Sequence, residues 1–298
     1  MKRALLTSIL FFALLLVSAQ QPQRNPESEN RTYKVMSFNI RMSGFSQSDG
    51  INAWSNRKEA VINMIHDVDA DFFGVQEMLP DQKQYLRKHL KEYDMVGVGR
   101  DDGKNEGECM AIFYKKKDFK LIKGRTFWLS ETPEAVSKGW DAACKRTLTY
   151  TCLQDKRNNQ NIYYFNTHLD HMGKIARRES VKLICRIIDS ICPQKELVPV
   201  ILSGDMNSTI EDDIFRPFEK NGLAASRDKA KKSSSLDTYN AYDKDGTFVT
   251  NKGAHVIDHF FNSACVEVAE FQTNVKDYGV PYISDHYPII LTFSIKKK

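Results

Sequence analysis

The stretch VILSGDMN, residues 200–207, is the segment from which the fold of this 298-residue chain can be inferred. Its apolar part belongs to a run over Val198–Ser203 that predicts a buried strand, and a carboxylate and an amide follow at once. The preceding segment, Ala176–Ile191, carries apolar residues at helical spacing and predicts a long amphipathic helix. A helix that leads into a buried strand is typical of an α/β protein.

Further β-like runs and two more helical patterns occupy most of the remaining chain. We expect helices over Arg57–Val68 and Asp81–Leu90, and a polar, turn-rich loop near the site over Ala224–Thr250. Consecutive strands without a long helix between them should pair antiparallel. Since sheets and helices must each bury an apolar face, we expect sheets packed on each other with helices outside. The other expected strands are Tyr33–Ile40, Asp71–Gln76, Tyr93–Val98, Cys109–Tyr114, Leu121–Leu129, Arg146–Leu153, Asn161–Leu169, His255–Asn262, Val266–Thr273 and His286–Ile295.

The first 19 residues predict a signal peptide that is cleaved near Ala19. Lys2 and Arg3 precede an apolar run over Ala4–Ala19, which ends in the small residues of a cleavage site. This run is shorter than the ~20 residues needed to span a bilayer, and no later run reaches that length. We therefore expect a secreted or periplasmic protein without a transmembrane segment in the mature chain. It would consist of a polar stretch over residues 20–31 and one domain over residues 32–298.

Composition excludes several classes of protein. A hydrophobic fraction of 41% and a charged fraction of 27% argue against long disorder, collagen or a coiled coil. The net charge of +5 is too small to indicate a nucleic-acid partner by itself. Six cysteines permit disulfides in an exported protein, but the chain has no CxxC pair that would suggest zinc.

Most of the chemically active residues stand at or near the ends of predicted strands, whereas Asp258 falls inside the expected strand His255–Asn262. Because burying an unpaired charge is costly, these residues should meet around a metal ion or an anion. Carboxylate and amide oxygens suit Mg²⁺, Mn²⁺ or Ca²⁺, and histidines beside them suit phosphate chemistry. Each residue alone has an ordinary structural explanation, such as a buried amide or a helix cap, and only their combination favours catalysis. The residues are Asn39, Glu77, His168, Asp205, Asn207, Asp258, Asp285 and His286.

The ordered motifs FNIR, QE, THLD, GDMN, IDH and SDHYPI resemble the endonuclease/exonuclease/phosphatase superfamily. They extend over most of the chain, and GDMN and SDHYP are specific when they occur together. The resemblance implies a deoxyribonuclease-like fold, a four-layer α/β sandwich with two mainly antiparallel sheets face to face and helices outside. It also implies hydrolysis of phosphoesters with a divalent metal, Mg²⁺ or Mn²⁺ with Ca²⁺ as a possibility.

Metal and water roles carry over from this resemblance to four residues. Glu77 would be the principal metal ligand, with Asn39 and Asp285 close by. Asp205 would orient or deprotonate the attacking water.

Phosphate roles carry over to five residues. Asn207 would bind the water or a phosphate oxygen, and His286 would bind or protonate the phosphate while Asp258 fixes its tautomer. His168 would occupy the histidine position of the deoxyribonuclease and phosphatase branches. Arg146 resembles the arginine that contacts phosphate in deoxyribonucleases.

Departures from the family's motifs narrow the choice of branch. Arg41 stands where abasic-site enzymes usually carry an aspartate, and the signature of inositol-phosphate 5-phosphatases is absent. The THLDH and WDAACKR segments are most similar to an uncharacterised branch that is often bacterial.

Three substrate hypotheses stay open, together with a fourth that involves no catalysis. The first is an exported nuclease acting as a monomer, which rests on analogy and on Arg41 and Arg146. The second is a sphingomyelinase-like phospholipid phosphodiesterase, for which Phe127–Trp128 or Tyr278–Tyr282 would form an exposed aromatic contact with membrane lipid. The third is a phosphomonoesterase of the same superfamily. A non-catalytic binding module is disfavoured because every expected acid, amide and histidine is present.

Overall fold

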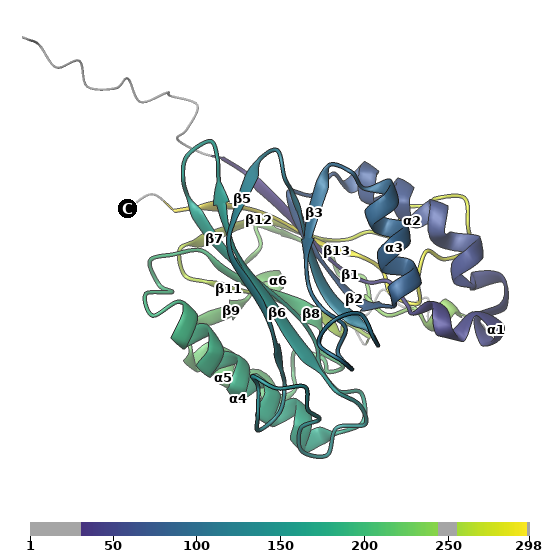
Figure 1. Ribbon diagram of the computed structural model, residues 1–298. Coiled ribbons are helices and arrows are strands. Elements are labelled where there is room, and N and C mark those ends of the chain that lie inside the picture. The colour runs from purple at the N-terminus through teal and green to yellow at the C-terminus, as the bar shows by residue number, and fades with distance from the viewer. Residues whose placement is uncertain (1–30, 244–254, 297–298) are drawn as a thin grey trace, which may run out of the picture.

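Two β-sheets packed face to face form the centre of the computed structural model, which describes residues 31–243 and 255–296 (Figure 1). The expected signal peptide and nearly all of the polar stretch after it lie outside the described residues. None of the described helices is long and apolar enough to cross a bilayer. All six cysteines fall within the described ranges, and none of them is paired in a disulfide.

The first sheet has seven strands and is mainly antiparallel, with parallel pairs at β1/β2 and β10/β12. The two neighbours β1 and β2 matter most for the site because their carboxyl ends lie at the same edge. In spatial order the strands are β10 (Lys232–Ser233), β12 (Val266–Thr273), β13 (Ile289–Ile295), β1 (Tyr33–Asn39), β2 (Phe72–Met78), β4 (Cys109–Lys115) and β3 (Tyr93–Val96).

The second sheet has six strands, and within it only β7 and β8 run parallel. Its inner face packs on the first sheet in one buried apolar cluster, where Tyr164 and Phe260 of this sheet join Phe72 of the first. The strands in spatial order are β5 (Phe119–Trp128), β6 (Thr147–Asp155), β7 (Asn161–His168), β8 (Val200–Asp205), β11 (Asp258–Ser263) and β9 (Leu223–Ala225).

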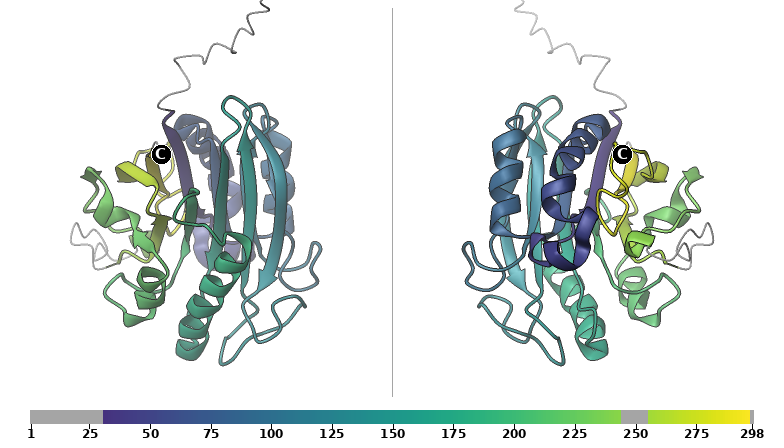
Figure 2. Two further views of the ribbon diagram at one scale, coloured as in Figure 1. Left: turned by 90° about the vertical axis from the view of Figure 1, so that its left-hand side faces the viewer. Right: turned by 90° about the vertical axis from the view of Figure 1, so that its right-hand side faces the viewer.

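Helices cover both outer faces (Figures 1 and 2). Helices α2 (Trp54–Val68) and α3 (Pro80–His89) pack on the seven-stranded sheet, while α4 (Lys174–Ile191) and α5 (Arg216–Lys220) pack on the six-stranded sheet. The expected four-layer α/β sandwich is therefore confirmed. Shorter elements are α1 (Ser46–Asp49), α6 (Ser226–Lys229) and the 3₁₀ turns η2 (Ser43–Phe45), η3 (Gly50–Asn52), η4 (Asp213–Phe215) and η5 (Ala241–Asp243).

Three expectations for the C-terminal half are wrong in detail. The segment Ala224–Thr250 is not a plain loop, because its described part contributes residues to β9, α6 and β10, and the two strands lie at the edges of the sheets. Asp258 is the first residue of β11 rather than an interior one, which places it directly opposite Asp205. The last strand begins at Ile289 instead of His286, since Pro288 lacks the N–H that a sheet ladder needs.

A buried polar seam joins the sheets just beneath the site. Asn166 of β7 donates to the carbonyl oxygens of Val75 (3.0 Å) and Ala111 (2.9 Å) in the other sheet, and it accepts from Gln76 (2.6 Å). The backbone of the facing strand approaches so closely that a Cβ at Gly74 would lie 2.6 Å from the Asn166 amide. Glycine is therefore required at this point, and the seam fixes the register of one sheet against the other.

Replacing Asn166 by leucine should lower the free energy of unfolding by about 2–4 kcal/mol, because two buried carbonyl groups and the Gln76 amide would each lose a hydrogen bond. Urea unfolding followed by circular dichroism measures the change. Gln84→Leu, which removes an exposed amide from α3, is the matched control and should shift stability by less than about 0.5 kcal/mol. An equally small effect of Asn166→Leu would show that the seam does not hold the sheets together.

Candidate active site

The predicted site residues come together at one end of the two sheets. Asn39, His168 and Asp205 are the last residues of β1, β7 and β8, and Glu77 lies near the end of β2. These strands form two parallel pairs, so their carboxyl ends meet at the same edge. Asp258 enters the same region at the start of β11.

The Asn39 amide bridges the two sheets at this edge. Its Nδ2 donates to Glu77 Oε1 and to Asp205 Oδ2, both at 3.0 Å. Its Oδ1 accepts from the backbone N–H of Arg41 at 3.0 Å. In this arrangement Asn39 positions the two carboxylates, and direct ligation of a metal by its oxygen stays a prediction.

Asp205 is buried, and its Oδ2 has three polar neighbours. Besides accepting from Asn39, this atom lies 3.4 Å from Nε2 of His168 and 3.6 Å from Nε2 of His286. Burial raises the pKa of Asp205, while the charge of His286 opposes that rise. The carboxylate is thus one that a nearby cation would keep ionised.

The two histidines beside Asp205 differ in charge: one is neutral and the other is cationic. Burial, with the charge of Arg146, lowers the pKa of His168 well below its ordinary value, so its ring is neutral. Burial would also lower the pKa of His286, but the charges of Asp258 and Asp205 outweigh it and raise this pKa to about 10. His286 Nδ1 lies 2.8 Å from Asp258 Oδ2. Asp258 therefore holds His286 as an imidazolium whose Nε2–H faces Asp205.

The GDMN turn places Asn207 beside His168. Asn207 Nδ2 lies 3.0 Å from His168 Nε2 and donates to the Leu169 carbonyl at 2.9 Å. Gly204 has φ +152°, and a Cβ there would lie 1.9 Å from the Thr167 carbonyl oxygen, so only glycine fits. Asn207 itself has φ +49°.

Arg41 and Asp285 complete the Glu77 side of the site. Arg41 Nη1 lies 3.4 Å from Asp285 Oδ2, and its other nitrogens bind Asp49 at 3.1 and 3.3 Å. Burial raises the pKa of Asp285, with Glu77 adding to the rise. Arg41 and Glu77 both have positive φ (57° and 62°), a strained conformation for non-glycine residues that recurs at functional sites.

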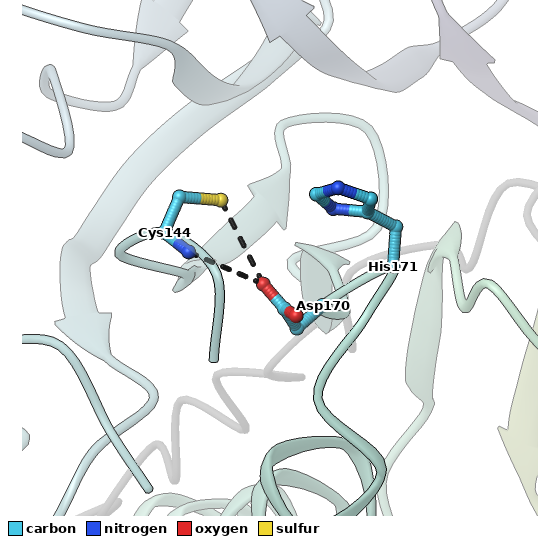
Figure 3. Close-up of side chains that lie close together, drawn as sticks. All are labelled: Cys144, Asp170 and His171. Atoms are coloured by element: carbon cyan, nitrogen blue, oxygen red, sulfur yellow. Dashed lines mark hydrogen bonds between the residues drawn. The ribbon is translucent and has the colours of Figure 1, made fainter. Parts of the chain in front are cut away.

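Arg146 is buried next to the site and is held by the residues that follow β7. Its Nε donates to Asp170 Oδ2 at 3.2 Å, and its Nη2 lies 2.9 Å from Nδ1 of His171. Figure 3 shows the backbone nitrogen and the sulfur of Cys144 directed at the same carboxylate. Cys144, Asp170 and His171 are close enough to hold a metal, but the Arg146 guanidinium already neutralises Asp170 there. This cluster therefore orients the arginine.

The donor set at the sheet edge fits a hard divalent cation. Potential ligand atoms of Glu77, His168 and Asp205 lie within 4.8 Å of one another. Carboxylate oxygens outnumber nitrogens there, as Mg²⁺ and Mn²⁺ prefer. Asp285 adds a further carboxylate on the Glu77 side of the site.

Comparison with known proteins gives the family. Residues 36–286 match the Endonuclease/Exonuclease/phosphatase family. The chain belongs to this family. Members of the family are hydrolases that act on phosphoester bonds, and they include nucleases and phosphatases.

Two solved structures and one curated relative illustrate the range of the endonuclease/exonuclease/phosphatase family. A family protein of Bacteroides thetaiotaomicron is 31% identical, with a TM-score of 0.83, and the match covers 91% of this chain and all of that one. A mannosyl-6-phosphatase of the same organism is 32% identical, with a TM-score of 0.80 and coverage of 88% and 99%. The CCR4-Not complex 3'-5'-exoribonuclease subunit Ccr4 of Mycosarcoma maydis is 29% identical over 66% of this chain, which spans only 36% of that relative.

Sequence reasoning missed charged residues that support this site. Arg57 of α2 is buried and donates to the carbonyl oxygens of Ile40 (2.6 Å) and Ile283 (2.9 Å), so it ties together the segments that carry Asn39 and Asp285. The sequence did contain a signal for Arg57. This charged residue is spaced from Ala60 and Met64 so that it lies on the apolar face of α2.

A second missed pair is Arg100 and Glu108, whose side chains meet at 2.7 Å. Burial raises the pKa of Glu108, and the charge of Glu77 acts in the same direction, which indicates that this pair lies near Glu77. No motif pointed to it.

Asp258→Asn should lower the pKa of His286 from about 10, because burial then acts without the attraction of the Asp258 charge. The Cε1–H resonance, followed by NMR against pH in metal-free protein, reports the titration. The wild-type protein, titrated under the same conditions, is the reference. An unaltered His286 titration would mean that Asp258 does not set its charge.

Asp170→Asn should lower kcat/KM for phosphoester hydrolysis about 10-fold or more by releasing Arg146. The amide oxygen can still accept from the backbone at Ala143, Met172 and Gly173, so the fold of the loop should survive.

Asp141→Asn is the matched control for Asp170→Asn. Asp141 accepts from the backbone N–H groups of Ile175 and Ala176 at the start of α4, in the same pair of loops. Asp141→Asn should change thermal stability without changing kcat/KM. Equal kinetic effects of the two variants would rule out a specific role for the Arg146 contact.

Proposed function

We propose that the protein is a divalent-metal-dependent phosphoesterase that hydrolyses phosphodiester bonds by in-line attack of water, with nucleic acid as its substrate. The observation that carries the proposal is the buried Asp205 carboxylate, shared by a neutral His168, a cationic His286 and the Asn39 bridge to Glu77. This arrangement combines a base, an acid and metal-binding carboxylates within a few ångströms.

Glu77 and Asp285, with Asp205 nearby, are the residues that would hold Mg²⁺ or Mn²⁺, and Ca²⁺ fits the same oxygen donors. When bound, such an ion neutralises a non-bridging phosphate oxygen and stabilises the leaving alkoxide. Arg41 and Asn39 keep these carboxylates in place.

The remaining residues act on the water and the phosphate. Asp205 accepts a proton from the attacking water or orients it, and Asn207, held by the Leu169 carbonyl, contacts the water or a phosphate oxygen. His286, kept charged by Asp258, donates its Nε2–H to the phosphate. His168 and Arg146 add donors for the charge that develops at phosphorus.

The pairing of positive charges favours a diester over a monoester. Three cationic side chains of the site already have carboxylate partners: Arg41 has Asp49 and Asp285, Arg146 has Asp170, and His286 has Asp258. A singly charged phosphodiester needs less compensation than a doubly charged monoester. This balance supports the nuclease hypothesis, as does the exoribonuclease named among the relatives.

A phosphomonoesterase acting on a sugar phosphate is the second candidate. It is favoured by the similarity to the mannosyl-6-phosphatase, which extends over nearly the full length of both chains. The phospholipid hypothesis loses part of its basis, because Phe127 and Trp128 are buried (8% and 6% exposed) and form no exposed aromatic contact.

We also propose that the enzyme is exported to the periplasm or the medium and works as a monomer. The N-terminal sequence over residues 1–19 supports export. The contacts of the site described above form within a single copy of the chain.

The test is product release from double-stranded DNA, single-stranded DNA, RNA, sphingomyelin liposomes and sugar monophosphates, each with Mg²⁺, Mn²⁺, Ca²⁺ or chelator. Chelator-sensitive cleavage of nucleic acid is the expected result. Cleavage of monoester or lipid alone would change the proposed substrate class but leave the assignment of the site intact. No turnover on any substrate would favour a binding module.

Two variants test the roles in the same assay. Glu77→Gln should raise the Mg²⁺ concentration for half-maximal activity about 10-fold or more, because one anionic ligand is lost. His286→Ala should lower kcat about 100-fold, and it should also lower stability because Asp258 would be left buried without its partner, so the assay is run where circular dichroism shows the variant folded. Glu219→Gln and His89→Ala, at exposed positions on α5 and α3, are the matched controls. Full activity of either site variant would contradict its assignment.

A further inference from the structure

An exposed aromatic ring lies directly beside the metal-binding side of the site. Phe45, the last residue of η2, is 45% exposed. Its ring centroid lies 4.4 Å from Cζ of Arg41, the residue whose Nη1 is 3.4 Å from Asp285. A single side chain therefore separates this ring from a carboxylate expected to hold the metal.

The segment that carries Phe45 is anchored to the site at several points. The backbone N–H of Met42 donates to Glu77 Oε2 at 3.1 Å, and that of Arg41 donates to Asn39 Oδ1 at 3.0 Å. The next N–H, of Ser43, donates to Gln82 Oε1 at 3.2 Å. The ring consequently has a defined position relative to the reacting phosphate before substrate binds.

Arg41 is not free to act as the phosphate ligand on this side. Its guanidinium is bound by both oxygens of Asp49 and lies against Asp285. Its remaining contact is the cation–π stack on Phe45, which fixes the orientation of the ring. An aromatic surface that is held in place and still open to solvent is a binding surface for another planar group.

We propose that Phe45 is a stacking platform for the base of the nucleotide attached to the scissile phosphate. The proposal rests on the function proposed above and names the group that the enzyme would recognise next to the phosphate. Stacking on an aromatic ring tolerates any base, because every base has a π-face. The platform would therefore strengthen binding of nucleotides in general without selecting a sequence.

The surroundings of Phe45 favour a base over a lipid surface. Segments that enter a membrane interface present several apolar side chains together. The neighbours of Phe45 are Gly44 and a set of serines with one glutamine, over residues 43–48. The next exposed apolar residue, Ile51, follows only after Asp49 and Gly50.

The experiment compares two ligands that cannot be hydrolysed because carbon replaces the ester oxygen. These are adenosine 5′-methylphosphinate and ribose 5-methylphosphinate, which carry the single negative charge of a diester, and each is titrated into the Mg²⁺-loaded protein in a calorimeter. The wild-type protein should bind the adenosine compound about 10-fold more tightly. Phe45→Leu should remove this preference and leave the Kd of the ribose compound unchanged, whereas Phe45→Tyr should retain the preference.

Ile122→Ala, at a residue that is 41% exposed on the part of β5 far from His168, is the control for loss of an exposed apolar side chain. A wild-type protein that does not distinguish the two ligands, or binds neither, overturns the platform. So does a Phe45→Leu variant that weakens both ligands equally, since the ring would then act only through Arg41. Diester cleavage by a protein that does not prefer the adenosine ligand would retain the proposed function and reject the platform. A preference for the adenosine ligand without diester cleavage would retain the platform and reject the proposed function.

Discussion

The Asn39 amide is the contact on which the rest of the site depends, because its two N–H groups join carboxylates from different sheets. Glu77 belongs to the seven-stranded sheet and Asp205 to the six-stranded sheet. Any shift of one sheet against the other would separate Glu77 and Asp285 from Asp205, and with them the two halves of the proposed site. The Asn166 seam beneath the site prevents such a shift by pairing buried polar groups across the same interface.

Charge pairing explains how so many ionisable groups are tolerated in a buried site. Asp258 keeps His286 charged, Asp170 holds Arg146, and Asp49 neutralises Arg41. Each pair offsets the cost of removing its charges from water and holds one side chain in a fixed direction. Asp205 lies between His168 and His286 at the centre of these pairs, and burial raises its pKa. A carboxylate in such a position is suited to accepting and releasing a proton.

Backbone conformation contributes to the same arrangement. Arg41, Glu77 and Asn207 all have positive φ, and each of them directs a functional side chain or segment into the site. Such conformations cost about 1–3 kcal/mol each and persist only where surrounding contacts enforce them. Here the enforcing contacts include the Arg57 hydrogen bonds to the segments around Ile40 and Ile283. The site is thus preorganised by the fold instead of being assembled by substrate.

Sequence alone determined the layered α/β architecture and eight residues that the fold brings to one edge, because apolar periodicity and polar strand ends are local properties of the chain. It placed Asp258 inside a strand and took Ala224–Thr250 for a loop, since short edge strands carry too little pattern to be seen. Only the tertiary structure decided that Asn39 donates to the carboxylates of Glu77 and Asp205. It also decided that Arg146 forms its ion pair with Asp170. It alone placed Arg57, Glu108 and Phe45 near the site. These contacts join residues far apart in the chain or depend on side-chain direction, and local sequence patterns carry no information on either.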